Sequence, residues 1–90
     1  MKDLEEPFIA KVKEYVDHQG IGGREIRIEK EGYLDYCLDT RNMTIAIYNF
    51  INRIDIFKYP DTTKVYYGHS DNGLGYFVLE EELEYAQDKR

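Results

Sequence analysis

The 90-residue sequence contains one cysteine, no tryptophan and two prolines, and it has no long apolar run. The single Cys37 cannot form an internal disulfide or contribute to a cysteine-rich metal site. A membrane-spanning helix needs about 18 or more consecutive apolar residues, so we expect none here. The N-terminal residues also lack the charged and then apolar pattern of a secretory signal. These absences predict a small soluble protein located in the cytoplasm.

Positive charge is also in short supply. Lysine and arginine number 12 against 18 aspartates and glutamates, which gives a net charge of −6 with both histidines neutral. The densest basic stretch, residues 24–30, also contains Glu25 and Glu29. Direct binding to DNA or RNA normally requires a basic face and is therefore disfavoured. The same net charge favours a protein partner with a basic surface.

Residues 3–19 carry the signals of an N-terminal helix. Asp3 can cap the first turn, with Glu6 three residues later as in a capping box, and Pro7 falls in the first turn. Apolar side chains then recur at helical spacing. The members of this apolar stripe are Phe8, Ile9, Val12, Tyr15 and Val16.

Residues 24–39 alternate between apolar and polar side chains, which predicts a β-hairpin with a turn at Glu31 and Gly32. Residues 43–54 are ambiguous, because their β-branched and aromatic residues also favour a strand. Their apolar spacing and their length without glycine or proline favour a helix. We therefore predict a central helix over residues 43–54.

The remaining sequence predicts a three-stranded meander followed by a short helix. The strands are expected at residues 54–59, 64–68 and 76–79, and Pro60 begins the turn between the first two. Residues 79–86 then combine glutamates with apolar residues at helical spacing. This pattern predicts a short C-terminal helix.

Together these elements predict a single α+β domain over residues 1–90. One antiparallel sheet of about five strands would carry an N-terminal helix, a central helix and a short C-terminal helix. The expected core consists of the apolar residues that face inward in these elements. They are Phe8, Val12, Val16, Ile26, Ile28, Leu34, Leu38, Ile47, Phe50, Ile54, Val65 and Phe77.

No combination of residues points to catalysis. Cys37 lies between Asp35 and Asp39 on a predicted strand, where neighbouring carboxylates disfavour the reactive thiolate. The glycine-rich loop at residues 68–75 lacks the lysine and the following helix of a phosphate loop. His69 with one nearby aspartate supplies too few ligands for a metal site. We therefore expect no enzyme activity, no cofactor and no metal.

The acidic segment at residues 80–84 and the nine tyrosines are the most unusual features of the sequence. The acidic segment contains no basic residue, so it is either a contact surface for a lysine- or arginine-rich partner or a solvated helix face. Tyrosine suits small cores as well as interfaces. The candidate partner-binding residues are Glu80, Glu81, Glu82, Glu84, Tyr66 and Tyr67.

These observations favour a small acidic protein-interaction module without catalytic activity. Its size and charge match those of small inhibitors, immunity proteins and accessory proteins of phages or mobile elements. The match is one of size and charge and involves no shared sequence motif.

Two alternatives stay open at this stage. The first is a binding protein for a small nucleotide-like ligand, which would combine tyrosine rings with Arg24, Arg27, His69 and Ser70. The second is a homodimer, because the sequence has more large apolar residues, such as Ile45, than a small core needs. A continuous acidic face would favour the interaction module, and a pocket that mixes rings with arginines would favour the ligand-binding protein.

Overall fold

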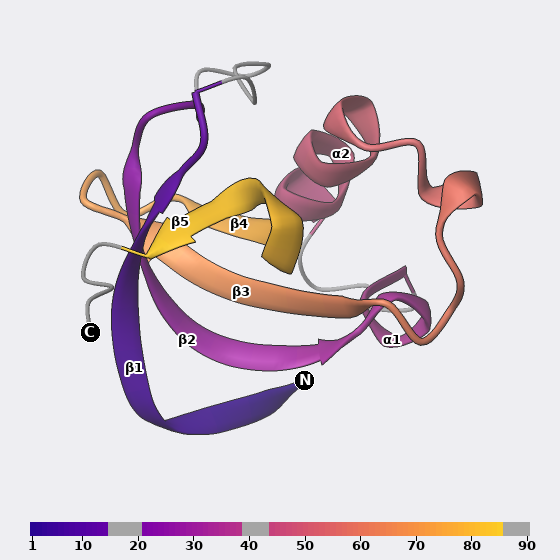
Figure 1. Ribbon diagram of the computed structural model, residues 1–90, viewed down its shortest axis with the longest axis horizontal. Helices are drawn as coiled ribbons and strands as arrows, with labels where there is room; N and C mark the ends of the chain where they lie inside the picture. Colours follow the sequence, from indigo (N-terminus) through magenta and orange to yellow (C-terminus); the bar gives the residue numbers. More distant parts are fainter. Residues whose placement is uncertain (15–20, 39–43, 86–90) are drawn as a thin grey trace.

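The computed structural model describes residues 1–14, 21–38 and 44–85 (Figure 1). These residues form one antiparallel five-stranded sheet with the strand order β4-β3-β2-β1-β5, accompanied by two α-helices and two short 3-10 helices. The elements are β1 (Lys2–Val12), β2 (Glu25–Tyr33), α1 (Leu34–Leu38), α2 (Thr44–Arg53), η2 (Ile56–Lys58), β3 (Lys64–Ser70), β4 (Gly75–Leu79), η3 (Glu80–Glu82) and β5 (Leu83–Tyr85). The α+β class and the antiparallel sheet agree with the prediction from the sequence.

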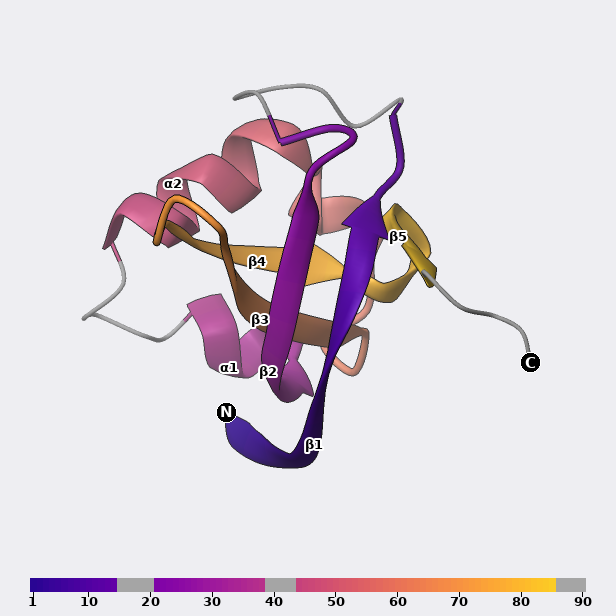
Figure 2. The same ribbon diagram turned by 90° about the vertical axis from the view of Figure 1, so that its left-hand side faces the viewer.

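The sheet is strongly curled because a very short link joins its two edge strands. β4 and β5 lie at opposite ends of the strand order, yet only η3 separates them in the chain. The backbone N–H of Lys13 donates to the carbonyl oxygen of Glu82 at 2.8 Å, which holds this link against the end of β1. The two edges therefore approach each other, and Figure 2 shows the strands wrapping around a common interior.

A bulge in β1 contributes to this curl. The pairing with β2 shifts register between Asp3 and Phe8, where residues 4–7 of β1 lie opposite only Glu29 of β2. Bulges bend the strand that carries the extra residues, and the indigo strand in Figure 1 bends sharply. Pro7 has no N–H to donate, so it is tolerated inside the bulge.

Apolar side chains form two clusters, one on each face of β3 and β4. The inner cluster fills the interior of the curled sheet, and the outer cluster lies between the sheet and α2. Successive residues of a strand point to opposite faces, so these two strands are buried on both sides. The inner cluster is Ala10, Val12, Ile21, Ile26, Ile28, Tyr66, Tyr76, Val78 and Leu83, and the outer cluster is Leu34, Ala46, Phe50, Val65, Tyr67, Phe77 and Leu79.

The predicted N-terminal helix is wrong, because residues 2–12 form β1. Side chains at Phe8, Ala10 and Val12 alternate toward the inner cluster, which is the period of a strand. The local capping pattern is overridden by pairing, since β1 bonds to β2 on one side and to β5 on the other. The remainder of the predicted helix, residues 15–19, lies outside the described residues.

Three further predictions of local structure are also wrong. Residues 34–38 form α1 instead of the second strand of a hairpin, because β2 pairs with β1 and β3 and leaves no free edge beside it. Residues 56–58 form η2 instead of a strand. The predicted C-terminal helix is replaced by η3 and β5, because Leu83 is buried inside the curled sheet. Residues 86–90 lie outside the described residues.

The central helix and the two strands that follow it are confirmed. α2 lies within the predicted span 43–54, and β3 and β4 cover the predicted strands at 64–68 and 76–79. Of the expected core, Val12, Ile26, Ile28, Leu34, Phe50, Val65 and Phe77 are buried, and Phe8, Ile47 and Ile54 pack against the clusters from partly buried positions. The side chains of Val16 and Leu38 lie outside the description.

We predict that Phe50→Ala destabilises the protein by about 3–5 kcal/mol, because it empties the centre of the contact between α2 and the outer face of the sheet. The matched control is Ile45→Ala on the exposed side of the same helix, which should change stability by less than about 0.5 kcal/mol. Equilibrium urea unfolding measures both values. Similar losses in the two variants would show that α2 does not pack on the sheet through Phe50.

Candidate functional site

The acidic segment does not form one continuous face. Glu80 and Glu81 on η3 and Glu84 on β5 are exposed, whereas Glu82 is buried. Glu81 accepts a hydrogen bond of 2.8 Å from the hydroxyl of Tyr59, and Glu84 lies opposite Lys11 of β1. The glutamates that follow one another in the sequence therefore occupy different environments.

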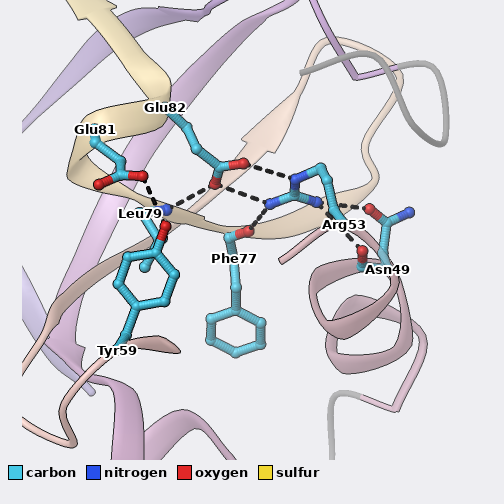
Figure 3. Close-up of polar contacts among 7 residues, drawn as sticks. All are labelled: Asn49, Arg53, Tyr59, Phe77, Leu79, Glu81 and Glu82. Carbon is cyan, nitrogen blue, oxygen red and sulfur yellow. Dashed lines mark hydrogen bonds and ion pairs between the residues drawn. The ribbon is translucent and has the colours of Figure 1, made fainter. Parts of the chain in front are cut away.

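Glu82 forms a buried, two-pronged ion pair with Arg53, the last residue of α2 (Figure 3). The Arg53 Nε–Glu82 Oε2 distance is 2.9 Å and the Nη2–Oε1 distance is 3.1 Å. The two side chains are 1% and 2% exposed. This parallel geometry is the strongest arrangement available to an arginine and a carboxylate.

The remaining hydrogen-bonding groups of the pair are also satisfied. Arg53 donates to the side-chain oxygen of Asn49 at 2.9 Å and to the backbone carbonyl of Phe77 at 2.6 Å. Glu82 accepts from the backbone N–H of Leu79 at 2.8 Å. The network connects α2, β4 and η3 (Figure 3). Glu82 therefore has a structural role, and the docking surface predicted from the sequence is left with Glu80, Glu81 and Glu84.

The two tyrosines predicted as partner-binding residues are buried. The Tyr66 ring lies in the inner cluster and meets Phe8 edge-on, with ring centres 5.8 Å apart. The Tyr67 ring lies in the outer cluster, with its centre 4.9 Å from that of Phe77. Neither tyrosine ring is therefore exposed for contact with a partner.

The structure brings the residues of the ligand-binding alternative to one end of β2 and β3. Arg27 and His69 pair across the strands, and both contact the Glu29 carboxylate, at 3.6 and 3.1 Å. Arg24 lies 3.9 Å from a carboxylate oxygen of Asp71. Ser70, the fourth candidate, is buried and hydrogen-bonds to Asn72. Carboxylates therefore lie against each of the two arginines and the histidine.

A surface that the sequence indicated only in part, at α2 positions such as Ile45, lies on the solvent-facing side of α2 and on η2. Ile45 and Tyr48 of α2 are 78% and 61% exposed, Ile51 is also exposed, and Phe57 of η2 is 93% exposed. We call these four residues the α2–η2 surface. A helix of a small domain normally turns polar residues to solvent. The exposure on α2 was indicated by the sequence, because the predicted helix has apolar residues on more sides than one core can bury. The exposure of Phe57 was not indicated, because residues 54–59 were predicted as a strand.

Features of other site classes are absent from the described residues. No cluster of three or more histidine, cysteine, aspartate or glutamate side chains is placed to hold a metal ion. Cys37 lies in α1 and not on a strand, so its predicted position between two aspartates of one strand face is wrong. No described helix is long and apolar enough to span a bilayer.

Comparisons with protein families, with curated proteins and with solved structures find no match for this chain.

We predict that Arg53→Met costs about 3–5 kcal/mol of unfolding free energy, because it leaves the Glu82 carboxylate buried without a counter-charge. The exposed pair of Arg24 and Asp71 supplies the control, and Arg24→Met should cost less than about 1 kcal/mol. Combining Arg53→Met with Glu82→Gln should cost less than the sum of the two single changes. Urea unfolding of the four variants gives the coupling, and equal losses at the two arginines would contradict the structural role.

Proposed function

We propose that this chain is a non-catalytic protein-interaction module that binds its partner through the α2–η2 surface. The observation that carries the proposal is the exposure of large apolar side chains on two consecutive elements. Exposed apolar patches on small soluble domains commonly mark contact sites. Aromatic residues such as Tyr48 and Phe57 are the kind that supply most of the binding energy at protein interfaces. The single cysteine is consistent with a cytoplasmic location.

The charges around this surface favour a partner with a basic rim. The hydrogen bond from Tyr59 to Glu81 and the ion pair of Arg53 with Glu82 hold η3 next to the C-terminal end of α2 and the end of η2. Exposed carboxylates at Glu80 and Glu81 therefore border the apolar side chains. Asp55 adds a third exposed carboxylate, which caps η2 by accepting a hydrogen bond from the backbone N–H of Phe57. Lys58, at the end of η2, carries the opposite charge.

A second copy of the chain fits this surface less well. Two copies would bring together two molecules of net charge −6, and the acidic border of one would face that of the other. Like charges at an interface oppose association. We therefore assign the surface to a different protein with a basic surface, which suits the inhibitor or immunity role proposed from size and charge. Light scattering should then give a mass near 10.7 kDa.

We predict that replacing Ile45, Tyr48 and Phe57 by serine reduces capture of the partner by at least about tenfold without unfolding the domain. A photo-crosslinking amino acid at position 48 identifies the partner directly, and one at exposed Leu74 in the β3–β4 turn is the control. Leu74→Ser should leave capture unchanged. The proposal fails if the same proteins are captured by the triple variant, or if position 74 crosslinks as well as position 48.

A separate prediction concerns the three exposed glutamates of the acidic segment at residues 80–84. Changing Glu80, Glu81 and Glu84 to glutamine should slow association with the basic partner and reduce its dependence on salt. Stability should stay within about 1 kcal/mol, because all three residues are exposed. Glu82 is left intact, because its carboxylate belongs to the buried ion pair. Binding rates measured across a salt series test this point, and unchanged rates and salt slopes would exclude steering by these residues.

A further inference from the structure

A pocket of about 460 Å³ opens beside the beginning of β1, where β2 ends, α1 follows and β3 begins. Both Figure 1 and Figure 2 place the N-terminus next to α1. The volume lies within the range of sites that hold small molecules. The lining residues are Met1, Lys2, Glu31, Gly32, Tyr33, Tyr36 and Lys64, and none of them belongs to the α2–η2 surface.

The pocket is locally basic in an acidic protein. Its lining includes the side-chain ammonium groups of Lys2 and Lys64 and the single carboxylate of Glu31, against a net charge of −6 for the whole chain. The carboxylate of Glu31 is engaged by Lys64 at 3.0 Å, and this contact, together with a hydrogen bond to Tyr66, raises the pKa of Lys64. Lys2 lies opposite Glu31 in the β1–β2 pairing. Its ammonium group forms no hydrogen bond or ion pair with another residue in the described part of the chain.

The pocket also presents aromatic rings. Tyr33 and Tyr36 line it and are 58% and 52% exposed, so their rings are accessible to a ligand. Tyr33 lies directly opposite Lys64 in the β2–β3 pairing, which puts a ring beside a cation. Met1 adds a polarizable side chain next to Gly32, where a Cβ atom would lie 3.2 Å from the Met1 Cγ atom. Aromatic faces and thioether groups bind planar ligands without requiring a particular hydrogen-bond pattern.

We propose that this pocket binds a small ligand that joins an aromatic ring to a negatively charged carboxylate or phosphate group. The ring packs on Tyr33 and Tyr36, and the anionic group pairs with the free ammonium of Lys2 beside Lys64. The sequence had predicted nucleotide-like binding at Arg24, Arg27, His69 and Ser70. Arg24, Arg27 and His69 each have a carboxylate oxygen within 3.9 Å, whereas the Lys2 ammonium forms no ion pair with a described residue.

The test uses AMP and benzoate as two sources of the same chemistry, with adenosine as the uncharged ring and ribose 5-phosphate as the anion without a ring. Each is titrated into the folded chain while the backbone amide signals are followed by NMR. We expect saturable shifts at residues 2, 31–33, 36 and 64 with both AMP and benzoate. Adenosine and ribose 5-phosphate should bind at least about tenfold more weakly than AMP.

Variants separate the contributions of charge and ring. Lys2→Gln should weaken binding about tenfold, whereas Lys58→Gln, on an exposed lysine outside the pocket, should not. Tyr33→Ala should weaken binding by about fivefold or more, and Tyr33→Phe should retain it, because the ring supplies the contact.

Three results would each overturn the proposal. The first is the absence of a saturable shift with either AMP or benzoate up to about 10 mM. The second is equal affinity for adenosine and AMP. The third is a set of shifts centred on Arg27 and His69 instead of the pocket residues. None of these results bears on partner capture by the α2–η2 surface, so the two proposals can fail independently.

Discussion

The buried ion pair between Arg53 and Glu82 is the interaction on which the relation between helix and sheet depends. Arg53 ends α2, Glu82 ends η3, and their hydrogen bonds reach the backbone of β4 at Phe77 and Leu79. A buried ion pair of this kind adds little net stability compared with apolar side chains of the same size. Its geometry is directional, however, so it fixes where α2 ends relative to the turn that joins the two edges of the sheet.

The sequence predicted best where one packing face dominated. Residues 44–53 form a helix because Ala46 and Phe50 recur on the side that meets the outer cluster. β3 and β4 were also predictable, because each contains a run of β-branched and aromatic residues between turn signals. Their burial on both faces was not predicted, because it depends on α2 covering the side of the sheet that faces away from the curled interior. The N-terminal segment failed for the opposite reason. Its capping signals are local, whereas its pairing partners are β2 and the distant β5.

The candidate site shows the same division between composition and placement. The sequence revealed an acidic segment, an excess of tyrosine and large apolar residues at positions such as Ile45. It could not show that Glu82 would be neutralised by an arginine 29 residues earlier. Nor could it show that both faces of β3 would be covered, which buries Tyr66 on one side and Tyr67 on the other. The pocket depends on three strands and a helix meeting at one end of the sheet, and no short motif encodes that meeting.

The pairing of β1 with β5 has a consequence for the order in which the protein folds. Ala10 pairs with Tyr85, so the last contact of the sheet joins residues from opposite ends of the chain. β3 and β4 are separated by a tight turn and can form as soon as they are made, because closing a short loop costs little entropy. During synthesis on the ribosome, β1 must therefore wait for β5 to emerge. Until then its outer edge is an open template for other strands, which leaves the nascent chain vulnerable to misassembly until residues 83–85 can pair with β1.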